Sequence, residues 1–201
     1  MAPIDAVTDP RIGTVVDKYR VTRFVGGGAT GRVYEAEHIE LGTRFALKFI
    51  ASELAANRER LRQFQNEAKA AGHLEHPNIA TVFDAGNAPD GSSYLVTEYL
   101  VGQDCGQLLA DQGPLPVRRA CEIVYSACTG LFAAHQAGIV HRDIKLKNLF
   151  ITEASDGGEQ VKILDFGIAK LRVPGASAAP VAAVAMETVY YMAPEQVRDA
   201  G

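Results

Sequence analysis

The sequence predicts an α+β fold in two lobes, with strands in the first half and helices in the second. Three early runs are rich in β-branched and aromatic residues and are separated by glycine-containing turns: VTRFV at 21–25, GRVYEAE at 31–37 and RFALKFI at 44–50. Farther along, apolar residues recur every three or four positions over 53–71 and over 116–137, which is typical of amphipathic helices. We expect the lobes to join near Tyr99 to Gly102.

Length and composition place the chain among ordinary globular proteins. Its 201 residues are 47% hydrophobic and 22% charged, which suffices for one sizeable core or two small lobes. The net charge of −4 provides no basic field for a nucleic-acid backbone. Phosphate groups would instead meet a few placed cations, so a nucleotide is a better candidate partner than a nucleic acid.

We expect no secretion signal at the N-terminus, because MAPIDAVTDPRIG lacks both a basic region and an apolar core. The most apolar tract, from Ala176 to Met186, is too short to cross a membrane and contains Pro180. We therefore expect a cytoplasmic chain with no membrane segment. Its three cysteines show no CxxC spacing.

The strand-rich half contains one helix. Residues 53–71 place Leu61, Phe64, Ala68 and Ala71 on one stripe and end at Gly72. Glu67 falls on or beside this stripe, where a charge usually needs a partner. Two further strands are expected at 80–84 and 93–99, separated by the turn-forming sequence NAPDGS.

The second half contains a long helix over 116–137, with Pro116 in its first turn and Gly138 after its end. Cys121 and Cys128 lie seven residues apart, and we expect them to act as small apolar residues on a buried face. The same face would carry Val117, Val124 and Leu131. Short strands are expected at 148–151 and 161–164, and the chain is irregular and alanine-rich beyond Asp165.

The stretch GGGATGRV at 26–33 fits three nucleotide-binding loops as well as a plain glycine-rich turn. The dinucleotide motif must open a helix, whereas these glycines lead into a strand. A Walker A loop needs Lys and then Ser or Thr, where this chain has Arg32 and Val33. The remaining nucleotide-binding alternative is a hairpin whose backbone lies over nucleotide phosphates, where a Cβ would block close approach. The loop by itself is equally consistent with a plain glycine-rich turn.

Other motifs follow the glycine loop in a fixed order: Ala46-Leu47-Lys48, Glu67, HRDIKLKN at 141–148, Asp165-Phe166-Gly167 and Ala193-Pro194-Glu195. From about Tyr19 to its end, the chain resembles the Ser/Thr protein kinases of the eukaryotic-like, bacterial type. The resemblance implies a bilobal fold: a lead at 1–18, an N-lobe at 19–99 with five antiparallel strands and a C-helix, and a mainly α-helical C-lobe at 100–201.

The resemblance also implies a reaction, the transfer of the γ-phosphate of ATP, with Mg²⁺, to a protein Ser or Thr. Lys48, held by Glu67, would contact the α and β phosphates. Asp143 would accept the proton of the substrate hydroxyl or orient that hydroxyl, and Lys145 would contact the γ-phosphate. Asn148 and Asp165 would hold Mg²⁺ through oxygen ligands. Thr188 is typical of the Ser/Thr class.

The remaining implied residues bind the nucleotide. The glycine loop, comprising Gly26, Gly27, Gly28 and Gly31, would cover the phosphates. The base would be sandwiched by Val33, Ala46 and Phe150. Backbone groups of Glu98 to Leu100 would bind adenine, and Asp104 would bind the ribose hydroxyls.

Departures from the family pattern point to an alternative function. Glu187 and Val189 stand where the family has Gly and Pro in the loop that docks the peptide. The chain stops at Gly201, six residues after Glu195, and we expect a truncated C-lobe with uncovered apolar surface, or a partner chain that covers it. The alternative is a non-catalytic, kinase-like module that binds nucleotide or regulates. A small-molecule phosphotransferase is disfavoured by Lys145 and by the DFG and APE motifs.

Overall fold

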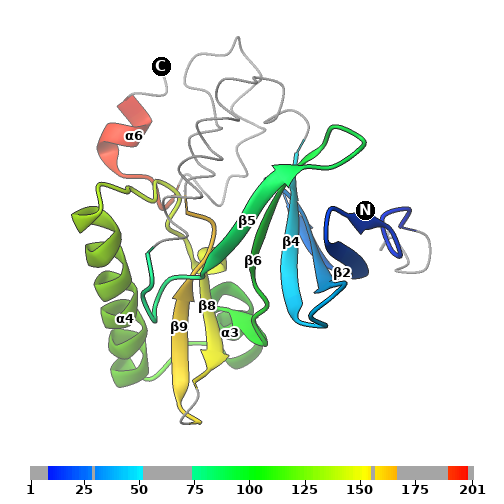
Figure 1. The fold of residues 1–201 in the computed structure, drawn as a ribbon. Coiled ribbons are helices and arrows are strands. Elements are labelled where there is room, and N and C mark those ends of the chain that lie inside the picture. Colours follow the sequence, from blue (N-terminus) through cyan, green and yellow to red (C-terminus); the bar gives the residue numbers. More distant parts are fainter. Residues whose placement is uncertain (1–8, 29, 52–73, 155–156, 167–189, 199–201) are drawn as a thin grey trace. The chain divides into compact units, whose positions relative to one another are not determined.

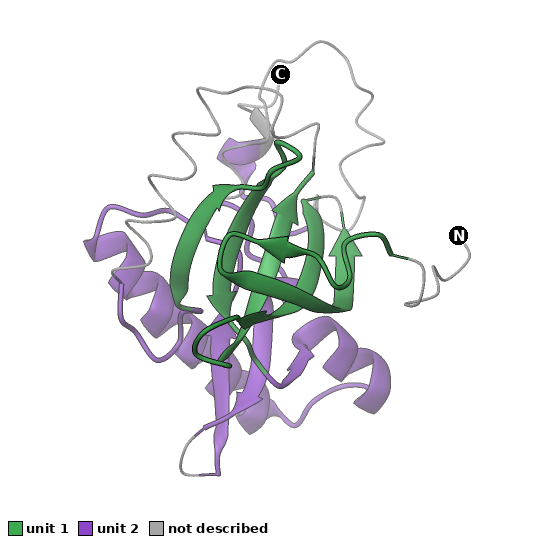
Figure 2. Cartoon of the chain, turned by 45° about the vertical axis from the view of Figure 1, so that its right-hand side comes forward, with its two compact units in different colours: residues 1–73, 81–100 green, residues 74–80, 101–201 purple. Residues whose placement is uncertain are grey.

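The computed structural model describes residues 9–28, 30–51, 74–154, 157–166 and 190–198 (Figure 1). The chain divides into two compact units, which are coloured separately in Figure 2. Unit 1 comprises residues 1–73 and 81–100, and unit 2 comprises residues 74–80 and 101–201. Each unit is built around its own antiparallel sheet.

Unit 1 contains a six-stranded sheet in the order β1-β2-β3-β4-β6-β5. Its strands are β1 (Val15–Val16), β2 (Tyr19–Gly28), β3 (Gly31–His38), β4 (Arg44–Ile50), β5 (Val82–Asn87) and β6 (Ser93–Glu98). The five expected strands are all present, although β5 begins two residues later than predicted. The short β1 is an addition, because the lead folds back antiparallel onto β2. The helix expected over 53–71 lies outside the described residues.

The two faces of this sheet differ. One face holds the core of the unit, in which Tyr34 meets Phe49 edge to face, with ring centroids 5.6 Å apart. That core also includes Val16, Tyr19, Val21, Ala36, Leu47, Ala88, Tyr94 and Val96. Because side chains alternate along a strand, Val33 and Lys48 lie on the opposite face.

Unit 2 combines a three-stranded sheet, in the order β7-β8-β9, with helices. Its elements are β7 (Gly102–Asp104), α3 (Cys105–Gln112), α4 (Val117–Gln136), η1 (Leu146–Asn148), β8 (Leu149–Glu153), β9 (Glu159–Ile163) and α6 (Pro194–Arg198). The long helix and the two strands expected here are confirmed. β7, α3 and α6 were not predicted. α4 runs alongside β9 (Figure 1).

The buried face of α4 is not the face that the sequence predicts. Cys121 and Cys128 are exposed, and so are Val117 and Val124. The helix instead buries Ile123, Ala127, Gly130 and Ala134. Small residues occupy this face because the helix backbone lies close to β9: a Cβ on Gly130 would lie 2.9 Å from Ile163 Cδ1. The large apolar side chains form an exposed stripe, which includes Tyr125 and Phe132.

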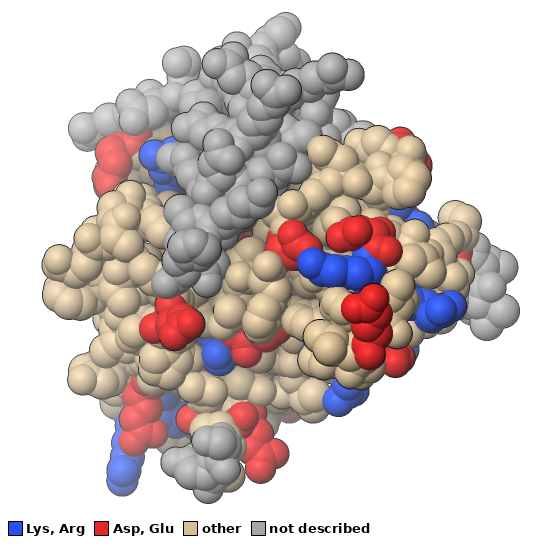
Figure 3. Space-filling view, viewed as in Figure 1, with Lys and Arg blue, Asp and Glu red and all other residues tan. Residues whose placement is uncertain are grey.

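The surface of the described residues mixes both signs of charge. Figure 3 shows Lys and Arg side chains interspersed among Asp and Glu side chains on one face of the molecule. Within the part of the chain that the structure describes, helices are too short or too polar to cross a membrane.

Candidate active site

The glycine loop is the tip of the β2–β3 hairpin in unit 1. Gly31 has φ +142°, and a Cβ there would lie 1.9 Å from the carbonyl oxygen of Phe49, so packing within the protein requires this glycine. A Cβ on Gly26 or Gly28 would meet no atom within 4 Å. Internal packing therefore does not account for the missing side chains at Gly26 and Gly28, whereas a ligand resting on the backbone would.

Lys48 shares one face of the unit 1 sheet with Val33 and Ala46, two of the residues predicted to sandwich a base. The third, Phe150, lies on β8 in unit 2. Val33 pairs with Lys48 between β3 and β4, and Ala46 pairs with Thr97 between β4 and β6. Directly paired residues of antiparallel strands point to the same face. Lys48 is only 7% exposed. Its predicted partner, Glu67, lies outside the described residues, as does Thr188.

The predicted adenine-binding segment follows β6. The backbone N–H of Glu98 donates to the Thr81 carbonyl at 3.0 Å, and the Glu98 side chain accepts from the Thr81 N–H at 2.8 Å. This double link holds the end of β6 in place, since both hydrogen-bonding groups of Thr81 are engaged. Leu100 is half-buried at the end of the unit.

In unit 2 the HRDIKLKN stretch brings three predicted residues together. The Lys145 Nζ lies 2.8 Å from the Asp143 Oδ2. The Asn148 Nδ2 donates to the backbone carbonyl of Asp143 at 2.7 Å, and a longer contact of 3.3 Å reaches its Oδ2. Asp143 and Asn148 are buried, at 9% and 5% exposed. A carboxylate in this setting has a fixed orientation.

His141 connects this loop to the segment that carries Asp165. Its Nδ1 accepts from the Asp143 N–H at 3.2 Å, and its Nε2 lies 2.7 Å from the Leu164 carbonyl. The ring also packs edge to face on Phe166, with centroids 4.6 Å apart. Burial lowers the pKa of His141, although the Leu164 carbonyl and nearby carboxylates oppose this shift. A neutral imidazole fits both hydrogen bonds.

Two residues in this region have backbone conformations that non-glycine residues seldom adopt. Arg142 has φ +67° and Asp165 has φ +64°. Such conformations persist only where the surrounding structure holds them, and they concentrate at functional sites. At Arg142 a holding contact comes from α6, where the Gln196 Nε2 donates to the Arg142 carbonyl at 2.8 Å. No motif in the sequence indicates this contact of Gln196.

Asp104 has a structural role that the sequence did not indicate. It is the N-cap of α3, and its Oδ1 accepts from the Gln107 N–H at 3.0 Å. It pairs with Phe150 between β7 and β8, so these two predicted nucleotide contacts are neighbours. A ribose contact would have to use the other carboxylate oxygen.

A cleft of about 530 Å³ lies in unit 2, and its lining includes Lys145, the ion-pair partner of Asp143. Lys145 and Lys147 line it, together with Tyr190 and Tyr191. Asp104 and the first turns of α3 complete its walls. Because Lys145 contacts both Asp143 and this cleft, a chain lying in the cleft would pass close to the Asp143 carboxylate.

Comparison with protein families gives a match to the protein kinase domain over residues 19–201. Among curated proteins, the serine/threonine-protein kinase Pkn3 of Myxococcus xanthus is 38% identical over 194 residues, which are 95% of this chain and 36% of that protein. PknA of Mycobacterium tuberculosis is 39% identical over 194 residues, or 93% of this chain and 43% of that protein. The chain thus spans less than half the length of these relatives.

Solved structures show the same similarity. The kinase domain of PknI from Mycobacterium tuberculosis matches with a TM-score of 0.70 and 36% identity, covering 78% of this chain and 61% of that one. A double mutant of the same domain matches with a TM-score of 0.72 and covers 63% of that chain. Sequence and backbone therefore agree on one family.

Proposed function

The chain belongs to the protein kinase family, and from this premise we propose that it transfers the γ-phosphate of ATP to a Ser or Thr hydroxyl of a protein. The observation that carries the proposal is the group formed by the buried Asp143 and Asn148 with the partly buried Lys145. Phosphoryl transfer spreads charge over oxygens, so the protein mainly positions groups and neutralises charge. A fixed carboxylate beside an ammonium group suits that task.

Asp143 would receive the substrate. Its carboxylate would accept the hydroxyl proton as the oxygen attacks phosphorus, and Lys145, 2.8 Å away, would neutralise charge on the transferred phosphoryl group. Asn148 holds the loop in shape through its bond to the Asp143 carbonyl. The cleft lined by Lys145, Tyr190 and Tyr191 would hold the residues that flank the hydroxyl.

ATP fits the features of unit 1. The face that carries Lys48, Val33 and Ala46 combines a buried cation with apolar side chains. Gly26 and Gly28 leave their backbone open to a ligand. Backbone groups of a glycine hairpin bind phosphates without needing a large positive charge, in keeping with the net charge of −4.

Mg²⁺ fits the donors near the Asp143 loop. The Asn148 Nδ2 is engaged by Asp143, so the side-chain oxygen of Asn148 is the atom available for a cation. Asp165 supplies a carboxylate from the neighbouring segment, and hard cations prefer such oxygen ligands. Within the described residues, there is no group of three or more His, Cys, Asp and Glu that could bind a metal by itself. Phosphate oxygens of ATP would complete the coordination when the ion is bound.

The test is the transfer of radiolabelled γ-phosphate to a generic protein substrate such as myelin basic protein. Asp143→Asn should lower the rate by roughly a hundred- to ten-thousandfold, the usual contribution of an acid–base group. Kd for Mg·ATP should change little, because the residue is assigned to the hydroxyl. Equal background transfer by the parent chain and by this variant would favour the non-catalytic alternative.

Glu153→Gln is the matched control. This exposed carboxylate ends β8 in the same unit, so its neutralisation should leave the transfer rate unchanged. An equal loss in both variants would show that carboxylate removal acts through stability and would contradict the role of Asp143.

A further inference from the structure

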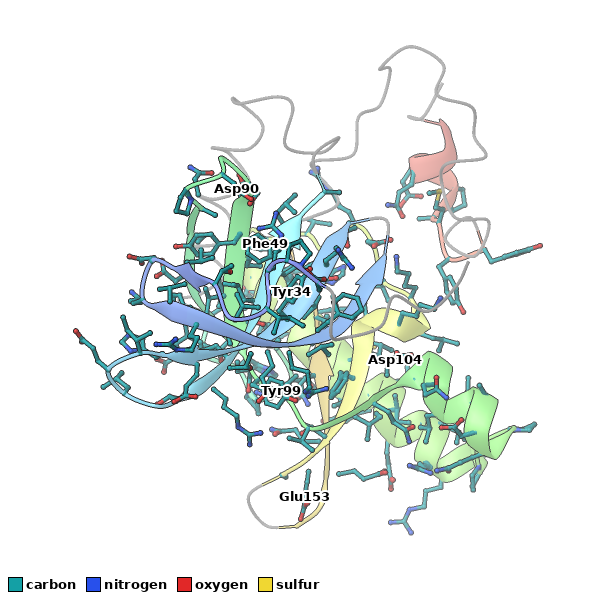
Figure 4. All side chains as sticks on the ribbon, turned by 90° about the vertical axis from the view of Figure 1, so that its right-hand side faces the viewer. Tyr34, Phe49, Asp90, Tyr99, Asp104 and Glu153 are labelled. Atoms are coloured by element: carbon teal, nitrogen blue, oxygen red, sulfur yellow. The ribbon has the colours of Figure 1, made fainter. Side chains whose placement is uncertain are left out.

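The lead folds over the core face of the unit 1 sheet, opposite the face that carries Lys48. We call residues 9–14 the N-terminal strap. Backbone hydrogen bonds fasten its end to β2: the Gly13 N–H donates to Val21 at 2.8 Å, and the Val21 N–H donates to Thr14 at 2.9 Å. In Figure 4 the labelled Tyr34 and Phe49 lie close together beside this blue segment. The strap is therefore an ordered part of the fold of unit 1.

Asp9 buries a carboxylate between the strap and β3. Its side chain is only 2% exposed. It accepts from the Tyr34 hydroxyl at 2.9 Å and from the Arg11 N–H at 3.0 Å, and the Arg32 Nη2 lies 3.2 Å away. A buried charge is costly unless it is paired and hydrogen-bonded. Of these three partners, only Arg32 supplies a full opposite charge.

The Tyr34 hydroxyl is a dependable donor to Asp9. Burial raises the pKa of Tyr34 to about 12, and the hydrogen bond to Asp9 and its negative charge act in the same direction. Tyr34 therefore keeps its proton throughout the neutral range. The hydroxyl is therefore available as a donor to Asp9.

Arg32 links the strap to the glycine hairpin. It follows Gly31 directly and pairs with Gly27 across the hairpin and with Phe49 on β4. Its guanidinium also lies over the Phe24 ring on β2, 4.9 Å from the centroid. Arg32 thus touches both strands of the hairpin on the face opposite the proposed nucleotide.

Among the described residues, the β2 arm of the hairpin tip contributes little side-chain packing on that side. Gly26, Gly27 and Gly28 offer no side chains, and the β2–β3 register shifts between Phe24 and Gly26. Glycine also loses more conformational freedom on ordering than any other residue. A side-chain anchor at the base of such a hairpin would lower the entropy lost when its backbone closes on a ligand.

We propose that Asp9 is a positioning residue that holds the glycine hairpin through Arg32 and so sets the affinity for the nucleotide. The strap acts from the back of the sheet and touches neither substrate nor Lys48. The inference rests on the proposed ATP-binding function, because the hairpin is assigned to the phosphates on that ground.

A second ion pair of the strap provides an internal control. The Arg11 guanidinium lies 3.8 Å from the centroid of the Phe49 ring and pairs with Asp90 at 3.1 Å. Asp90 belongs to the turn between β5 and β6 and carries a half-exposed side chain. Asp90→Asn therefore removes a strap ion pair away from the hairpin.

The experiment measures Kd for Mg·ATP by calorimetry, and KM and kcat for transfer, in the parent chain and in Arg32→Gln, Asp9→Asn and the double variant. Each single variant should raise Kd and KM for ATP by roughly three- to tenfold, the usual coupling between neighbouring side chains, with kcat changed by less than about twofold. The double variant should be no weaker than the worse single variant. Arg32→Lys, which keeps the charge, should restore most of the affinity.

Two results would overturn the inference. One is parental affinity in both Arg32→Gln and Asp9→Asn. The other is an equal rise in Kd in Asp90→Asn, because the strap would then act only through general stability. Thermal unfolding of each variant, followed by circular dichroism, identifies any that fails to fold. Arg32→Gln is the safest variant, because the Arg32 side chain is 40% exposed.

Hydrogen exchange without nucleotide separates this inference from the proposed function. Amides of Gly26 to Gly28 should exchange faster in Arg32→Gln than in the parent chain, while those of β4 stay unchanged. Unchanged exchange at the glycines would refute the anchor even in an active kinase. If the glycine amides exchange faster in Arg32→Gln but the parent chain binds no ATP, the anchor is supported and the proposed function is contradicted.

Discussion

At the scale of single residues, His141 acts as a neutral bridge. Its Nδ1 accepts from Asp143 and its Nε2 donates to the Leu164 carbonyl, so both nitrogens are used without a positive charge. Protonation would turn Nδ1 from an acceptor into a donor. The Asp143 N–H would lose its partner, and the loop that aims the Asp143 carboxylate would loosen.

This bridge predicts a loss of stability in mild acid. Because burial lowers the pKa of His141 in the folded protein, the unfolded chain binds a proton first as the pH falls below about 6.5. The stabilisation is therefore fully present above that pH and decreases toward the folded pKa. The expected slope is at most about 1.4 kcal/mol per pH unit. Urea unfolding at pH 7.5, 6.5 and 5.5 would measure it.

Two variants isolate the contribution of His141 from that of other groups. His141→Asn should flatten the dependence on pH, even though its overall stability is lower. His135→Asn changes an exposed histidine in the last turn of α4 and should keep the parental slope. A parental slope in His141→Asn would contradict the assignment.

At the scale of elements, α4 has two apolar faces with different jobs. The face of small residues allows the helix to approach β9, and Thr129 hydrogen-bonds to Asn78 beside it at 2.9 Å. The carbonyl of Asn78 accepts from the Ile163 N–H at 2.9 Å, so the helix packs against a hydrogen-bonded junction. Size rather than hydrophobicity selects the buried face.

This close approach makes Gly130→Ala destabilising, contrary to helix propensity. Alanine gains up to about 1 kcal/mol over glycine within an exposed helix. Here its Cβ would lie 3.0 Å from the Asn78 carbonyl oxygen, and overpacking of this kind costs about 1–3 kcal/mol. We expect a net loss of about 1 kcal/mol in the free energy of urea unfolding.

Val124→Ala on the exposed face is the matched control. It raises helix propensity and removes a side chain that is 59% exposed, so it should be neutral or slightly stabilising. If Gly130→Ala is as stable as this control, the contacts around Asn78 can accommodate an added methyl group, which would contradict the prediction.

The same helix shows where the sequence could guide prediction. Alternation and glycine turns predicted the strands around Lys48, because a strand of a half-buried sheet leaves a period-two pattern. The order of motifs predicted the meeting of Asp143, Lys145 and Asn148. Helical periodicity, however, does not show which of two apolar stripes on a helix is buried. No feature of the sequence near Gly130 indicates that Ile163 would pack on it.

Other features depend on contacts made across long stretches of sequence. The sequence predicts only a short polar lead before the first strand, and the fold shows that Asp9 of this lead is buried beside Tyr34, 25 residues away in the sequence. The cap role of Asp104 followed from α3, whose eight residues carry too weak a pattern to predict. The buried contact between Asp9 and Tyr34 is set by tertiary structure, whereas the Asp104 cap is a local contact three residues along the chain.

At the scale of the whole molecule, the proposed chemistry draws on both units. Unit 1 carries the glycine hairpin and Lys48, and unit 2 carries Asp143, Asn148 and Asp165. A ligand that binds only the folded protein raises its stability in proportion to the logarithm of ligand concentration over Kd. Mg·ATP at 100 times its Kd should therefore add about 2.7 kcal/mol, seen as a rise in the midpoint of thermal unfolding.

Two lysine variants sharpen this prediction. Lys48→Met removes the buried cation of the nucleotide face and should abolish most of the rise. Lys18→Met removes an exposed lysine that pairs with Asp84 in the same unit, and the rise should persist. If Mg·ATP does not change the midpoint of thermal unfolding of the parent chain, the proposal that the chain binds the nucleotide is contradicted.

The exposed stripe of α4 has a practical consequence for bioconjugate chemistry. Cys121 and Cys128 lie seven residues apart on it, which places their attachment points about 10 Å apart along the helix axis. Cys105 is buried, and burial raises its thiol pKa to about 11, so it is mostly unreactive near neutral pH. A maleimide fluorophore or spin label would therefore attach selectively to α4. The unmodified sequence therefore provides two labelling positions, both on α4.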